Sequence, residues 1–162
     1  ALMGKKKGGG AAAGGGKGES PMFAAIKQGD EDAINTMLKE DPKLLEQKNG
    51  DGWTPLMQAS FSGEMDVVHL LLKAKADATA KCKDGDTALH YASAQGHQDV
   101  IRRLFKAPKV NPTATDGDGE TPADVAQNGK VKKLIEQLID QAGEDDGDDE
   151  DDDDDEYEDD DQ

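Results

Sequence analysis

One short phrase recurs three times along the chain at nearly constant spacing. It begins with a threonine, at Thr54, Thr87 and Thr121, and the intervals between these residues are 33 and 34. Each threonine follows an Asp-Gly pair after one intervening residue. A unit of this length cannot bury its apolar side alone, so neighbouring copies must stack. The period therefore predicts an elongated stack of similar units rather than one closed core.

Apolar residues recur at fixed distances after each threonine, in pairs that lie four residues apart. Such pairs share one stripe of a helix and predict the helix that meets the stack. Glycines at Gly63 and Gly96 predict left-handed ends to the preceding helices. In the last repeat Gly129 is displaced by one residue, so we expect a distorted inter-helix turn there. The apolar residues of the stripe are Val67, Val68, Leu71, Leu72, Val100, Ile101, Leu104, Phe105, Leu134, Ile135, Leu138 and Ile139.

A degenerate first copy precedes these three repeats. Ser20 and Pro21 stand where Thr-Pro stands later, and Gly29 takes the place of the helix-ending glycine. Serine or threonine followed by proline suits the capping residue and first turn of a helix. End repeats are expected to be atypical because their outer sides meet water. The sequence thus predicts four helix pairs over residues 20–142.

The phrases Thr54-Pro55-Leu56-Met57 and Thr87-Ala88-Leu89-His90, with their spacing, resemble those of the ankyrin-repeat family. The resemblance covers about three quarters of the chain, and three repeats are in register. It implies an all-α ankyrin-repeat solenoid of about four helix-pair repeats with projecting hairpin loops, or fingers. It also implies binding through the finger tips and first helices. The expected repeats are residues 20–53, 54–86, 87–120 and 121–142.

The two ends differ from the repeats in charge. The net charge is −17, yet residues 144–162 hold 16 acidic groups and the remainder holds 19 basic and 20 acidic groups. We expect a disordered Gly/Ala/Lys arm at 1–19 and a disordered acidic tail at 143–162, because neither buries enough apolar surface to offset its ordering entropy. Ala1 and Leu2 precede Met3 and are interpreted as a cloning remnant.

Several broad classes are disfavoured. A single cysteine, Cys82, excludes an internal disulfide and suits a reducing compartment, so a cytoplasmic or nuclear location is expected. No stretch has the roughly 20 apolar residues of a membrane span, so no membrane association is expected. Lys5, Lys6 and Lys7 are too few to assign nuclear import. A monomer is expected, although the sequence does not decide the oligomeric state.

Catalytic, cofactor and metal sites are not expected. Asp116, Asp118 and Glu120 alternate as in a calcium loop, but Thr121 replaces the required glycine. No cysteine or carboxylate lies at zinc spacing beside the histidines. The family resemblance instead gives His90 a structural role, in which its ring bridges backbone groups of adjacent repeats. The chain is therefore expected not to be an enzyme.

Two aromatic residues are candidates for a binding surface. Trp53 lies between Asp-Gly and Thr at a finger, and Phe61 lies seven residues after Thr54 on the first helix. Exposed aromatic residues of this kind dominate interface energy. The alternative is that Trp53 folds against its own hairpin and Phe61 packs on a neighbouring helix. Tyr91 is expected to be packed.

Acidic residues supply the other candidate contacts. Those of the fingers would favour a basic partner mildly, since turn chemistry explains three of them. Tyr157 stands alone among acidic residues in the tail and resembles the aromatic anchors of some histone chaperones. The tail opposes direct binding of nucleic acid. The finger acids are Asp51, Asp84, Asp86, Asp118 and Glu120.

Two functions of different class follow. The first is a non-enzymatic adaptor that binds a protein partner through the fingers and groove. The alternative is a chaperone or escort for a basic client, such as a histone or ribosomal protein, with the acidic tail as the main contact. The tail could equally be only solubilising. Salt distinguishes the two functions, because a polyacid contact weakens as the Debye length falls below ~10 Å at 0.1 M.

Overall fold

The computed structural model describes residues 19–144, so the expectations for the arm, for Tyr157 and for most of the acidic tail lie outside it. Within that range the chain contains helices and no strand. In chain order these are α1 (Pro21–Gln28), α2 (Glu31–Glu40), the short 3-10 helix η2 (Pro42–Glu46), α3 (Pro55–Ser62), α4 (Met65–Lys73), α5 (Ala88–Gln95), α6 (Gln98–Phe105) and α7 (Gly129–Glu144).

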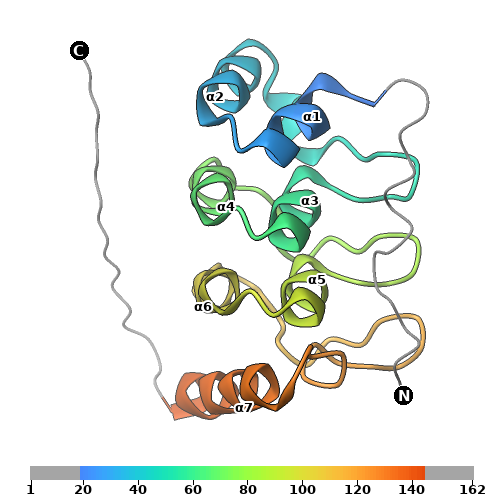
Figure 1. Ribbon diagram of the computed structural model, residues 1–162, viewed down its shortest axis with the longest axis vertical. Helices are drawn as coiled ribbons and strands as arrows, with labels where there is room; N and C mark the ends of the chain where they lie inside the picture. The colour runs from blue at the N-terminus through green and yellow to red at the C-terminus, as the bar shows by residue number, and fades with distance from the viewer. Residues whose placement is uncertain (1–18, 145–162) are drawn as a thin grey trace.

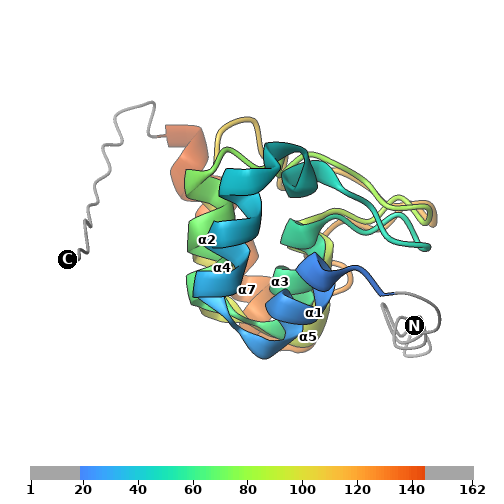
Figure 2. The ribbon, with the colours of Figure 1, turned by 90° about the horizontal axis from the view of Figure 1, so that it is seen from above.

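The helices form two layers (Figure 1). The inner layer contains α1, α3 and α5, and the outer layer contains α2, α4, α6 and α7, each packed on the next. The loops that precede α3 and α5 project together from the inner side, as does the loop after α6 (Figure 2). This arrangement is the solenoid with projecting fingers that the repeat predicts.

The expected helix boundaries are confirmed where the repeat is regular. Thr54 and Thr87 cap α3 and α5, and their side chains accept hydrogen bonds from backbone N–H groups three residues later. Ser20 caps α1 in a similar way, through the amide of Met22. The inner helices end at glycines with left-handed φ of 69° to 77°, a conformation that glycine adopts without a steric penalty: Gly29, Gly63 and Gly96.

The apolar stripe forms the core between the layers. Val67, Val68 and Leu71 of α4 are buried, as are Val100 and its neighbours Ile101 and Leu104 on α6. In the second pair of each of these helices, the last residue is only half-buried against the core, as at Leu72 in α4 and Phe105 in α6. No helix among residues 19–144 is both long and apolar enough to cross a bilayer.

The last repeat departs from the pattern more than we expected. Instead of a complete inner helix with a distorted end, residues 122–125 form turns that begin at Thr121. Gly129 does not end a helix but is the first residue of α7. The segment is held to the preceding repeat by the Gln127 amide, which donates to the Ser93 carbonyl oxygen at 2.9 Å. Among the described residues, α7 is the only helix that follows this segment.

Candidate protein-binding face

Each finger is closed by the same local hydrogen bonds. The turn glycine has a left-handed φ of 83° at Gly52 and 84° at Gly85, which fits the expected role of the Asp-Gly pairs. The bond that closes each finger is 3.0 Å long and runs from an amide N–H to the carbonyl oxygen four residues later: Asn49 to Trp53, Cys82 to Asp86, and Asp116 to Glu120.

Neighbouring fingers are joined to one another through their backbones. The Lys83 amide donates to the Asp51 carbonyl oxygen at 3.3 Å, and the Gly117 amide donates to the Asp84 carbonyl oxygen at 2.7 Å. Two different repeats contribute to each bond, so the fingers form one connected row. A face built on this row is organised before any partner arrives.

Three aromatic rings meet where the first finger joins the inner helices. The ring centroids of Trp53 and Tyr91 lie 4.4 Å apart, and those of Trp53 and Phe61 lie 5.3 Å apart. Trp53 is only 3% exposed, so the expectation that it is an exposed anchor is wrong and the packing alternative holds. Phe61 is half-buried and keeps part of its ring at the surface. Tyr91 is buried, as expected.

Cys82 belongs to the same buried region and is not exposed at its finger. Its Sγ lies 3.1 Å from the hydroxyl oxygen of Tyr91 and also accepts the Asp84 amide at 3.3 Å. Burial first, and then the contact with Cys82, raise the pKa of the Tyr91 phenol above its usual value. The phenol therefore stays protonated and can link the second finger to α5.

A cluster of buried polar side chains lies one repeat further on and includes Asp86, which was expected among the acids of the finger surface. Asp86 is 1% exposed, so it cannot contribute to an acidic surface on the fingers. Its carboxylate, a ring nitrogen of His90 and a carboxylate oxygen of Asp116 lie within 4.8 Å of one another. Both Trp53 and Asp86 immediately precede a helix-capping threonine. That place faces the stack and not the finger tip.

Two residues of this buried group, His90 and Asp116, already bind backbone groups of the protein. The backbone N–H of Thr87 donates to Nδ1 of His90 at 3.2 Å, so Nε2 carries the hydrogen and donates to the Glu120 carbonyl oxygen at 2.9 Å. Oδ1 of Asp116 accepts two backbone N–H groups of its own finger. We therefore assign the group a structural role, in which His90 bridges adjacent repeats as expected.

The surface that remains on the fingers is mixed in charge. Asp51, Asp84 and Asp118 are exposed, and Glu120 is half-buried. Lys81 and Lys83, which lie between Asp51 and Asp84 in the chain, are also exposed. The acidic row is therefore shorter than expected and consists of three exposed carboxylates on the fingers.

The inner helix that carries Phe61 is fixed from the next repeat. Nε2 of His97 donates to the Phe61 carbonyl oxygen at 3.0 Å. In the last repeat the side chain of Gln127 donates in the same way to the Gln95 carbonyl oxygen at 3.0 Å. The sequence signal for this link is that His97 directly follows Gly96, the glycine that ends α5.

Comparison with known proteins agrees with the architecture. The family model for ankyrin repeats matches three copies, at residues 3–82, 21–116 and 66–151. The chain is 43% identical over 54 residues to human ankyrin repeat and SOCS box protein 2, which covers 33% of this chain and 8% of that protein. It is 38% identical over 61 residues to rat ankyrin repeat and SAM domain-containing protein 6, covering 38% of this chain and 7% of that one.

The chain thus corresponds to less than a tenth of the length of these relatives. Among solved structures, the ankyrin repeat domain of Bcl-3, a member of the IkappaB protein family, superposes with a TM-score of 0.67 at 22% identity. That match covers 74% of this chain and 52% of the other, and it bears on the fold alone. Ankyrin repeats are protein–protein interaction modules. With its family model matched along most of its length, this chain belongs to the ankyrin-repeat family.

Proposed function

We propose that the chain is a non-enzymatic adaptor that binds a protein partner across its fingers and inner helices, with Phe61 as the central apolar contact. The partly exposed ring of Phe61 on a buried aromatic cluster is the observation that supports this proposal. Trp53 and Tyr91 hold the ring from below, so little side-chain entropy is lost when a partner covers it. Hot spots are typically aromatic groups supported in this manner.

The chemistry of the partner follows from the charges on the fingers. Asp51, Asp84 and Asp118 are exposed on consecutive fingers. They suit a partner that presents lysine or arginine beside an apolar side chain. Charges at the rim of an interface mainly affect orientation and the association rate, while the apolar centre supplies affinity. Binding should therefore tolerate moderate salt.

The test uses a matched pair of phenylalanines. Phe61 and Phe105 are both half-buried, but Phe105 lies on α6 in the outer layer. Proteins captured from cell extract by the wild-type chain should also be captured by Phe105→Ala and lost with Phe61→Ala. For an isolated partner, Phe61→Ala should weaken binding by at least about ten-fold, the size of a hot-spot loss. Equal capture by both variants would reject the finger and inner-helix face.

The alternative is an escort for a basic client, such as a histone or ribosomal protein, and the charge of the tail favours it. Residues 144–162 hold 16 of the 36 acidic groups and no basic group. Titration of a histone into the full chain and into a form that ends at Glu144 distinguishes the two functions. Tail-dependent, salt-sensitive binding supports the escort, and a further loss with Tyr157→Ala would identify an anchor. Equal affinity of the two forms removes this alternative.

A further inference from the structure

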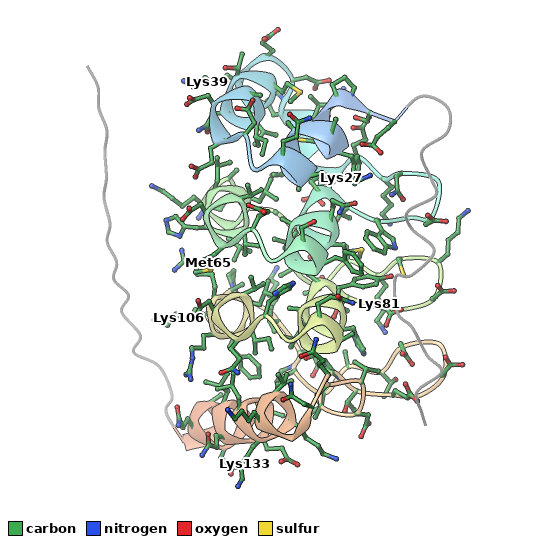
Figure 3. The ribbon with its side chains drawn as sticks, in the orientation of Figure 1. Lys27, Lys39, Met65, Lys81, Lys106 and Lys133 are labelled. Atoms are coloured by element: carbon green, nitrogen blue, oxygen red, sulfur yellow. The ribbon has the colours of Figure 1, made fainter. Side chains whose placement is uncertain are left out.

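Lysines occupy one place at the ends of three successive outer helices. Lys39 lies in the last turn of α2, Lys73 in the last turn of α4, and Lys106 directly follows α6. All three are exposed. Because α2 packs on α4 and α4 packs on α6, their ends form a column along the stack. Lys39 and Lys106 lie on the outer-helix side in Figure 3, whereas Lys27 and Lys81 lie on the side of the inner helices and fingers.

Two more lysines follow these helices in an unusual backbone conformation. Lys75 has a φ of 76° and Lys109 a φ of 65°, and no other non-glycine residue between 19 and 144 has a positive φ. L side chains adopt this conformation at an energetic cost that glycine does not have. The helix dipole accounts for a lysine in a last turn. It does not account for lysines beyond the helix, at two places where folding alone favours glycine.

These five residues, Lys39, Lys73, Lys75, Lys106 and Lys109, are here named the lysine column. Arg102, one turn earlier on α6, is exposed and adds positive charge. Acids near the column include Glu40, Asp41, Asp77 and Glu46, whose Oε2 accepts the backbone N–H of Asp77 at 3.0 Å. The pKa of Asp77 is lowered first by its hydrogen bonds to Thr79 and then by Lys109 and Lys48.

The acidic tail begins after α7, the helix that packs on the last helix of the column. Helix α7 packs on α6 and continues to Glu144. In Figure 2 its last turn lies on the same side as the loops that leave α4 and α6. From α7 to α2 there are three helix-to-helix steps of about 8–10 Å each, or about 30 Å in all. The 18 residues from 145 to 162 could span up to about 60 Å, so their length is sufficient.

We propose that the acidic segment 145–162 binds along the lysine column of its own chain. The segment carries 15 carboxylates, and it follows α7, which packs on α6, the last helix of the column. Covalent attachment gives the segment a millimolar effective concentration at the column, which favours this contact over a free anion or a second copy. The fingers lie on the other side and carry exposed acids, so they remain free.

This contact would regulate the tail. A basic client would have to displace the lysine column before it could bind the carboxylates, so weakly basic proteins would be excluded. The contact does not depend on the finger face, and it would persist if Phe61 had no partner.

Zero-length cross-linking of the full chain with a carbodiimide tests the proposal, because this reagent joins only carboxylates and amines that touch. Mass spectrometry should find links from residues 145–162 to Lys39, Lys73 and Lys106. Their yield should fall at least about five-fold between about 20 mM and about 0.5 M salt, as the Debye length shortens. Links spread over all exposed lysines, including Lys27 and Lys83, would overturn the proposal.

The double variant Lys75→Gly, Lys109→Gly removes two charges at places whose backbone suits glycine. It should retain the fold and reduce the links to Lys39, Lys73 and Lys106. The control Lys27→Gln, Lys83→Gln removes two charges elsewhere and should leave those links unchanged. If the glycine variant fails to fold, Lys73→Gln with Lys106→Gln should reduce the links to Lys39, Lys75 and Lys109 instead. Undiminished links in the folded variant, or links between copies of different isotopic mass, would overturn the proposal.

Discussion

Trp53 shows how a single side chain connects two repeats. It comes from a finger, yet its ring packs on Tyr91 of the next inner helix and on Phe61 of its own. The hydrogen bond from His97 to Phe61 crosses the same boundary, and the bond from His90 to Glu120 joins α5 to the next finger. At the scale of residues, the stack is held by side chains that reach from one repeat into its neighbour.

The burial of Trp53 predicts its fluorescence. It is the only tryptophan, so the emission reports on this one environment. We expect blue-shifted emission that acrylamide quenches poorly, and a red shift on unfolding. Trp53→Ala should destabilise the chain by about 3–5 kcal/mol, as for other buried aromatic truncations. Emission typical of water in the folded protein would contradict the packing and restore the exposed anchor.

Asp124 predicts a dependence of stability on pH. Its hydrogen bonds to the backbone and side chain of Thr121 lower its pKa from 3.8 in the folded state. A lowered folded pKa stabilises the fold above the unfolded value, and that contribution is lost as the pH falls through the folded value. The stability difference between wild type and Asp124→Ala in urea should therefore be present at pH 6 and shrink below about pH 4. Thr121→Val should reduce the same stability difference. A difference between wild type and Asp124→Ala that stays constant down to pH 2 would show that the Asp124 carboxylate does not stabilise the fold through these hydrogen bonds.

At the scale of helices, each outer helix uses one stripe to join two repeats. Leu104 on α6 is fully buried. Leu104→Ala should cost about 2–5 kcal/mol, because it removes apolar contacts and leaves a cavity. Gln98→Ala on the exposed side of the same helix should change stability by less than about 0.5 kcal/mol. Denaturant melts measure both, and an unchanged Leu104→Ala would mean that the stripe is misplaced.

The ends of α4 and α6 carry a cost that glycine would relieve. A left-handed L residue costs about 1–2 kcal/mol, and glycine adds about 0.5–1 kcal/mol of entropy to the unfolded chain. Lys75→Gly and Lys109→Gly should therefore each raise the free energy of unfolding by about 0–1.5 kcal/mol. Thermal melts of the single variants measure the gain, with Lys27→Gly in the last turn of α1 as a destabilised comparison. A marked loss at Lys75 or Lys109 would show that the lysine side chain itself supports the fold.

At the scale of the whole molecule, stability is a sum over contacts between neighbours. A fragment of residues 20–142 should unfold in one transition near that of the full chain. A fragment of residues 20–120 should melt lower, because it exposes the side of α6 that packs on α7. Denaturant melts followed by circular dichroism compare the two. A 20–142 fragment that fails to fold would show that residues outside it are required.

The sequence determined the parts of this fold that repeat. The period, the helix caps and the apolar stripe are local features that recur in every repeat. A feature that is unclear in one repeat can therefore be recognised from the same position in the others. Thr54, Thr87, Gly63 and Gly96 therefore occupy the predicted places. The ankyrin architecture, the bridging role of His90 and the packing of Tyr91 also follow from this pattern.

Only the tertiary structure decided where the non-repeating side chains point. Trp53 and Asp86 each directly precede a helix-capping threonine, a position that the sequence alone allows to be exposed on a finger. Packing against the neighbouring repeat buries both side chains. The lysine column is similar, because Lys39, Lys73 and Lys106 are more than 30 residues apart in sequence and become neighbours only when the outer helices stack. The burial of Trp53 and Asp86 and the alignment of these lysines all depend on contacts between repeats, which the sequence of a single repeat does not contain.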